Sequence, residues 1–570
     1  MALTTSLHTA LTGLSNSSRM LNVTGNNIAN VNTTAFKRSR TDFQTSLNTQ
    51  LSSANGPTAS HGGQNPAQVG HGTMLAGITR DFRGGPLQPT GMNTDLAIDG
   101  NGFFIVDDGG TQRYTRSGNF NLDANFNLVT HDGQRVQGFG ADEDGRIMDG
   151  RLQDINIPLG NLTVAEATTS VQMGGNLNAG GEIATQGSIN VSNPLFTDAA
   201  ATTPATASDM IESLYDSDGK QLFNVGDVIT FQNVSKGGAR LPEKTFEIGA
   251  NNTTGSDAYG ATLGEFAGFL ESVIGIDAGI SGGVQVDANG QIAITGNSGT
   301  VNDVNIDPSD IVVNKNTDNA LSPFAWDKQQ QANGESVRTT FMAYDSLGNE
   351  MDFSLSMVLE NKSNAGTTWR YYVQGDENPD LQRALATGTV QFDSAGHLLS
   401  DTAPAFTVDR SNTGAQTPQL ISIDLDPEDR TFSALSDESS KIATINRNGA
   451  PIGTLEDFHV SPDGTIDGIF SNSLTRVLGQ VATANFSNPQ GLAEGGANLF
   501  DTTANSGAPQ IGTPTTGGLG RIVGSALEQS NVDLSEEFID MIAATTGFSA
   551  NSRVLSTSDR LIQELLNTIR

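Results

Sequence analysis

The chain has 570 residues, a formal net charge of −33 and no cysteine. Its length predicts several domains, because a single hydrophobic core rarely grows beyond about 250–300 residues. Without cysteine the chain has no disulfide, thiolate metal site or cysteine nucleophile, and its acidic charge argues against nucleic-acid binding, which needs a basic surface.

The first 31 residues carry a helical pattern. Apolar side chains recur at alternating steps of three and four residues, which is typical of one face of a coiled-coil helix. Sixteen of these residues are Ser, Thr, Asn or Gly, so we expect the segment to be mostly unfolded in isolation. The predicted seam of this helix consists of Leu3, Leu7, Ala10, Leu14, Leu21, Ile28 and Val31.

The same N-terminus has neither the basic segment nor the apolar core of a secretory signal peptide. If the protein is exported, we therefore expect another route. Along the whole chain, apolar runs stay well short of the roughly 20 residues that span a bilayer, so we expect no membrane insertion.

The long middle of the chain reads as β structure between two linkers. Residues 32–75 and 505–520 are loop-like and rich in Gly, Pro and Thr, and strand–turn–strand runs follow one another between them. Residues 263–274 have the pattern of a helix inside this β material.

The C-terminal segment repeats the helical pattern of the N-terminal one. Its predicted seam consists of Phe538, Met541, Phe548, Leu555, Ile562, Leu566 and Ile569. Both ends of one chain thus carry a heptad-like stripe, which favours a coiled coil between them. Two arrangements stay open: an ordinary two-helix bundle within one molecule, or helices that become ordered only when neighbouring copies cover their remaining apolar residues.

The predicted fold class is a mainly β multidomain protein with nested insertions and a coiled-coil domain formed by the paired terminal segments. We expect four domains. They are residues 1–75 with 505–570 (terminal helices and linkers), 76–165 with 445–504 (β-rich), 166–190 with 325–444 (outer, β-rich), and 191–324 (an additional inserted domain).

The sequence gives little support for catalysis or cofactor binding. The six histidines are scattered without metal-ligand spacing. Residues 123–127 approach a calcium loop, but Leu128 stands where the loop needs Gly and Gln134 where it needs Glu. Residues 279–283 match the letters of a nucleophile elbow but precede a strand-like run instead of a helix. We therefore expect no catalytic, cofactor or metal site, and no enzyme.

Several ordered motifs resemble those of flagellar rod, hook and hook-associated proteins. Runs 96–104, 114–120 and 530–538 are similar to motifs of the rod and hook branch, and runs 344–349, 464–472 and 486–492 favour the hook. Residues 191–324 show no clear match. Ala35 stands where the family usually has Gly, which argues against a positive-φ turn there. The N-terminal family motif comprises Asn26, Asn27, Ile28, Ala29, Asn30, Phe36 and Lys37.

The resemblance implies an extracellular subunit that leaves the cell through the flagellar type III export apparatus. It implies a homopolymer that forms a curved, flexible tube, the universal joint between motor and filament. The other implied partners are the distal rod, the hook–filament junction and the hook cap, with no cofactor and no nucleic acid. A distal rod or other axial protein is the alternative within the family. A secreted β-rich adhesin or binding module is the alternative from another class.

Overall fold

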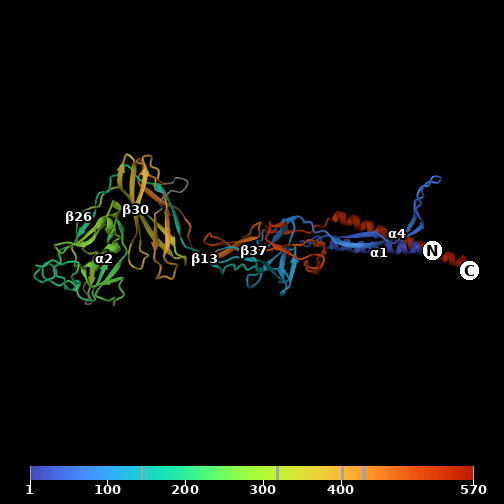
Figure 1. The fold of residues 1–570 in the computed structure, drawn as a ribbon. Helices are drawn as coiled ribbons and strands as arrows, with labels where there is room; N and C mark the ends of the chain where they lie inside the picture. The colour runs from blue at the N-terminus through green and yellow to red at the C-terminus, as the bar shows by residue number, and fades with distance from the viewer. Residues whose placement is uncertain are drawn as a thin grey trace. The chain divides into compact units, whose positions relative to one another are not determined.

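The computed structural model describes residues 2–142, 145–148, 150–315, 320–399, 404–425 and 432–568. Along the chain, a long helix comes near each end and many short strands come between them in sequence, as the colours of Figure 1 show. The chain divides into two units, residues 1–163 with 454–570 and residues 164–453. The predicted fold class is confirmed, since the protein is mainly β, one unit is inserted into the other, and the terminal helices pack together.

The first unit begins and ends with the two long helices. Helix α1 spans Ala2–Ala29 and helix α4 spans Leu534–Thr568, and they lie side by side (Figure 1). The carboxylate of Asp533 accepts the N–H groups of Ser535 and Glu536 at 2.8 and 3.4 Å, so it caps the start of α4. Neither helix has the length and hydropathy of a membrane span, and the same holds for the other helices of the described segments.

Strands from the early and late parts of the chain pair within this unit. Ile98 lies opposite Ile522, Phe104 opposite Thr483, and Gly138 opposite Val481. The early strands are β1 (Ser39–Thr45), β2 (Asn48–Ser52), β3 (Ala67–Gly70), β4 (Thr73–Arg80), β5 (Leu87–Pro89), β6 (Leu96–Asp99), β7 (Phe103–Asp107), β8 (Gln112–Thr115), β9 (Asn121–Leu122), β10 (Leu128–Val129), β11 (Arg135–Gly140) and β12 (Gln153–Asp154). The late strands are β36 (Thr465–Phe470), β37 (Thr475–Val481), β38 (Thr483–Asn485), β39 (Ala493–Gly496), β40 (Leu499–Asp501), β41 (Gln510–Gly512), β42 (Arg521–Gly524) and β43 (Ala526–Glu528).

Aromatic rings fill the core of this unit. Phe103 and Tyr114 each meet Phe486 edge to face, with ring centroids 5.7 and 4.8 Å apart. Much of residues 32–75, where the sequence favours a loop, instead belongs to two antiparallel ribbons, β1 with β4 and β2 with β3. Most side chains of these ribbons are exposed, so their strands lack the alternating apolar pattern by which a strand is predicted.

In the second unit, one part is a sandwich of two sheets. Strands β27 (Ser336–Tyr344), β28 (Glu350–Ser363), β29 (Gly366–Gly375) and β30 (Ala384–Asp393) form an antiparallel sheet. Trp369 belongs to the apolar core that the two sheets share and is fully buried. The facing sheet contains β14 (Ser170–Asn176), β31 (Ala405–Val408), β32 (Gln419–Asp424), β33 (Phe432–Ser433) and β34 (Lys441–Arg447). Two further strands, β13 (Thr163–Glu166) and β35 (Ala450–Val460), lie where the chain passes from one unit to the other.

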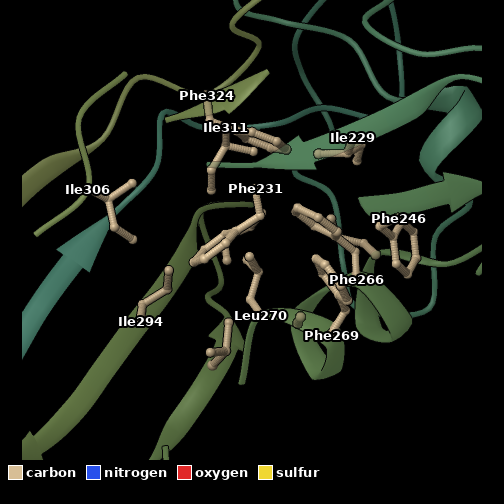
Figure 2. Close-up of a cluster of buried hydrophobic side chains, with 14 of the residues drawn as sticks. Ile229, Phe231, Phe246, Phe266, Phe269, Leu270, Ile294, Ile306, Ile311 and Phe324 are labelled. Atoms are coloured by element: carbon tan, nitrogen blue, oxygen red, sulfur yellow. The ribbon is translucent and has the colours of Figure 1, made fainter. Parts of the chain in front are cut away.

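The other part of this unit has its own core around helix α2 (Leu263–Ile274), which the sequence pattern predicts. Thr262 and Glu265 form a capping box at its start, and Gly275 ends it with φ 68°. Phe266, Phe269 and Leu270 of α2 lie among side chains of the surrounding strands (Figure 2). Around them are β15 (Gly187–Val191), β16 (Val228–Phe231), β17 (Ser235–Lys236), β18 (Ala239–Arg240), β19 (Lys244–Ile248), β20 (Ala258–Gly260), α3 (Ala278–Ser281), β21 (Gly283–Val286), β22 (Ile292–Ser298), β23 (Val304–Asn305), β24 (Ile311–Asn314), β25 (Ala320–Leu321) and β26 (Asp327–Gln330).

Candidate assembly interface

Helices α1 and α4 meet through small and polar side chains. An added Cβ at Gly13 would lie 2.6 Å from Asn551 Nδ2, and one at Gly547 would lie 3.1 Å from Ser17 Oγ. Such close approach requires residues without bulk at the contact. The buried residues of the two helices are Ala10, Asn16, Thr24 and Asn27 on α1, of which Asn16 donates to Thr73 of β4, and Glu537, Ala544 and Ser558 on α4.

The predicted seam residues of α1 lie mostly at the edge of this contact. Ala10 is buried. Half-buried positions are Leu7, Leu14, Leu21, Ile28 and, just beyond the helix end, Val31. The side chain of Leu3 lies outside the described residues.

The predicted seam of α4 is divided between two faces. Met541, Leu555 and Ile562 are half-buried, whereas Phe538, Phe548 and Leu566 keep 51%, 37% and 63% of their surface exposed. Ile569 lies outside the described residues. The face that meets α1 is displaced by about one residue, because its buried members are Glu537, Ala544 and Ser558. Hydrophobicity alone does not mark these positions.

Large apolar side chains are left exposed on α4 from its first turn to its last described turns, and we call this set the α4 ridge. So many exposed large apolar side chains on one helix favour an interaction site. Its members are Leu534, Phe538, Ile539, Ile542, Phe548, Val554, Leu561, Leu565 and Leu566.

Where α1 ends, a network that we call the polar junction ties the two ends of the chain together. It comprises Asn27, Lys37, Arg38, Arg116, Glu528, Asn531 and Glu537. Asn27 Nδ2 donates to Ser39 O at 2.8 Å and to Glu537 Oε2 at 3.1 Å, and its Oδ1 accepts the Ser39 N–H at 3.1 Å. An asparagine that is poor for helix formation thus joins α1, β1 and α4.

Three charged side chains are buried at the centre of the polar junction. Lys37 Nζ lies 2.5 Å from Glu528 Oε1, and both side chains are fully buried. Arg116 approaches the other Glu528 oxygen at 3.6 Å. Burial lowers the pKa of Lys37, against the attraction of Glu528, and burial also lowers the pKa of Arg116. The Gly85 N–H donates to Glu528 Oε1 at 2.9 Å, so this carboxylate serves several donors.

Arg38 links the same region to the first turns of α4. Its guanidinium lies 2.6 Å from Glu536, 2.5 Å from Glu537 and 3.4 Å from Asp540. The Arg38 N–H donates to Asn531 Oδ1 at 2.7 Å. The acidic side chains also suit the positive end of the helix dipole.

The remaining family-motif residues have unequal surroundings. Phe36 is buried, Ile28 and Asn30 are half-buried, and Asn26 and Ala29 are exposed. The expectation that Ala35 avoids a positive φ is wrong, because its φ is 56°. Its N–H donates to Glu528 O at 2.8 Å and its methyl is buried, which offset the strain.

Sequence reasoning found Asn27 and Lys37 but missed the other residues of the polar junction. Arg116 and Asn531 lie inside runs that resemble the family, which was a signal without an assigned role. Glu528 lies outside these runs and carries no such signal, since it is 491 positions from Lys37. Within the described segments, no group of three or more His, Asp or Glu side chains is arranged to hold a metal ion.

The two terminal helices flank the inserted β-rich part in the sequence, and family models match along both units. The model for flagella basal body rod protein matches residues 7–37, and that for the flagellar hook protein FlgE/F/G D1 domain matches residues 97–194. The model for the flagellar basal body protein FlaE D2 domain matches residues 312–450, and that for the flagellar basal body rod FlgEFG protein C-terminal matches residues 523–568. The class is therefore a flagellar axial protein.

Full-length relatives narrow the class. The flagellar hook protein FlgE of Borreliella burgdorferi is 30% identical over 570 residues, 98% of each chain. That of Treponema pallidum is 29% identical over 571 residues, 99% of each chain. The crystal structure of Helicobacter pylori flagellar hook protein FlgE2 is 19% identical and covers 78% of this chain and 100% of its own, with a TM-score of 0.39. The chain belongs to the flagellar hook protein FlgE family.

Membership makes the chain a structural subunit of the flagellar hook, as the resemblance implies. The matches give no support to a distal rod protein or to a secreted adhesin. The family is structural, and its members belong to the hook and basal body of the flagellum.

Proposed function

We propose that the chain polymerises through α1 and α4 into a curved, flexible tube that transmits torque from motor to filament. The α4 ridge carries this proposal, because one molecule leaves its large apolar side chains uncovered. Neighbouring copies would cover the ridge, while the small and polar contact face holds α1 and α4 together. Contacts that repeat without closing produce an open helical polymer.

The predicted seam residues keep this role as part of the proposal. The half-buried residues of α1 flank the contact with α4, and Phe538, Phe548 and Leu566 point to contacts with other copies. We also propose the four domains outlined from the sequence, with the helical domain in the inner tube and the β domains outside. Because α1 is rich in poor helix formers, we expect it to be ordered only on assembly.

The proposed partners are further copies of this chain, the axial proteins at both ends of the hook, the hook cap and the type III export apparatus. A chain without cysteine suits export in an unfolded state, since no disulfide has to be broken. We propose no catalytic activity.

Replacing one ridge residue tests the proposal. Ile542 is 65% exposed in the single chain, so Ile542→Asp should leave the unfolding of the monomer unchanged. Burial of such a side chain contributes about 1.5–3 kcal/mol, which corresponds to a rise of roughly 10- to 150-fold in the critical concentration. Electron microscopy and sedimentation of the purified full chain measure this concentration.

Ser549→Asp is the matched control, because it adds the same charge at an exposed polar position of α4. It should polymerise within a few-fold of the wild type. Normal polymerisation of Ile542→Asp would refute the role of the ridge.

A further inference from the structure

Residues 191–324 rest on a buried polar face of the β27–β30 sheet. The strand register places Arg338, Ser356 and Tyr372 opposite one another, and Ser354 opposite Gln374 in a neighbouring row. Directly paired residues project to the same side of a sheet. All of these except Arg338, which is half-buried, are buried, so the face is polar and yet closed to solvent.

The C-terminal end of α2 is held against this face. Gln374 Nε2 donates to Gly275 O at 2.8 Å, and the Arg383 N–H donates to Ser272 O at 3.2 Å. Lys236 Nζ donates to Ile274 O at 3.1 Å and to Gly275 O at 3.0 Å. The last carbonyls of the helix are thus already supplied with donors. We call this contact region the Gly275 joint.

The Gly275 joint holds more donors than acceptors. The Arg383 side chain is 9% exposed, its Nε lies 3.5 Å from Asp376 Oδ1, and its Nη1 has no hydrogen-bond partner among the described residues. Arg338 Nη1 donates to Lys236 O at 3.2 Å, but the buried Nε of Arg338 also lacks an acceptor there. Buried N–H groups without acceptors are rare in folded proteins.

The charges of the Gly275 joint agree with this excess of donors, because most of its charged groups are cationic. Burial lowers the pKa of Lys236 well below its usual range, and Arg383 and Arg338 lower it further. Asp376 is the carboxylate that acts on both arginines, and its own side chain is partly exposed. The joint therefore combines net positive charge with buried donors that point to a missing acceptor.

We propose that the Gly275 joint binds a small inorganic anion of the chloride class between Arg338 and Arg383. The anion would accept the buried Nη1–H of Arg383 and the Nε–H of Arg338, and would offset their charge where solvent cannot. It would fix residues 191–324 to the β27–β30 sheet, so that the two move as one body. This inference does not depend on polymerisation.

Calorimetry of the full chain in sodium chloride and in sodium gluconate at equal ionic strength tests the proposal. Chloride should raise the unfolding temperature of the second unit by about 3 °C for each tenfold increase in its concentration above the dissociation constant, whereas gluconate should not. Arg383→Gln should abolish the difference between the salts. Arg370→Gln removes a charge from the same sheet, where Arg370 pairs with Glu360 at 2.7 Å, and should preserve it.

Chloride NMR of the wild-type chain keeps the test independent of any variant. Binding should broaden the ³⁵Cl resonance, and added bromide should compete the broadening away. Equal unfolding temperatures in the two salts without broadening would overturn the proposal and leave ordered water as the acceptor. So would a chloride response that survives in folded Arg383→Gln.

Discussion

The polar junction makes a sharp prediction for Glu528. Its carboxylate is fully buried between Lys37 Nζ at 2.5 Å and Arg116 at 3.6 Å, and it also accepts the Gly85 N–H. Glu528→Gln keeps the shape and one acceptor but removes the charge. Two buried cations then lack a counter-charge, which is the costly way to break a buried ion pair.

We expect Glu528→Gln to lower the free energy of unfolding of the first unit by about 3–5 kcal/mol, the range for removing one partner of a buried pair. Lys37→Met in the same chain should recover part of this loss, because it removes one of the stranded charges. The two substitutions should therefore be clearly non-additive. Arg83→Gln is the control, since Arg83 pairs with Asp81 at an exposed position and its loss should hardly change the free energy of unfolding.

The two tryptophans give this experiment an internal reference. Trp326 and Trp369 both lie in the second unit, so their fluorescence during urea unfolding reports that unit alone. Calorimetry or circular dichroism follows the first unit. If Glu528→Gln costs less than about 1 kcal/mol, or shifts the tryptophan transition equally, the buried charges do not stabilise the first unit as argued.

Three further predictions follow from local geometry. An added Cβ at Gly118 would lie 1.7 Å from a backbone oxygen, so Gly118→Ala should destabilise the first unit by about 3 kcal/mol in calorimetry, whereas Gly77→Ala, with nothing within 4 Å, should not. Glu247 lies in β19, and hydrogen bonds from the two consecutive threonines in the turn after this strand lower its pKa to about 2 from its usual 4.5. Its contribution to stability is therefore complete above pH 4.5 and lost as the pH falls towards 2, so the melting temperature of the second unit should drop less steeply there in Glu247→Gln, and identical profiles would contradict this. Ala35→Gly should change stability by less than about 1 kcal/mol in urea unfolding, because relief of strain, loss of methyl burial and the freedom of Gly nearly cancel; a loss above about 2 kcal/mol would refute this balance.

Local patterns predicted those elements whose cause is local. The helix Leu263–Ile274 was readable because its apolar residues recur at helical spacing. The terminal helices were readable for the same reason. The ribbons of residues 39–80 were not, because their exposed strands have no alternating apolar side chains.

Contacts that close over long stretches of chain escaped prediction. Lys37 and Glu528 are 491 positions apart, and neither carries a sign of its partner. A lysine in a polar motif reads as a solvated charge until the fold buries it. Composition limits the number of charged residues that can be buried, but it does not say which charges meet.

The orientation of α4 escaped prediction for a reason that bears on assembly. Steps of three and four fit two adjacent faces of one helix, and hydrophobicity selects the face that carries Phe538. The fold instead turns Glu537, Ala544 and Ser558 towards α1. Small residues there let the helices approach without using the large apolar side chains. If those large side chains had faced α1, one molecule would bury its own ridge, and little apolar surface would remain to drive polymerisation. We therefore infer that the weakness of the pairing within one chain is what leaves α4 available to its neighbours.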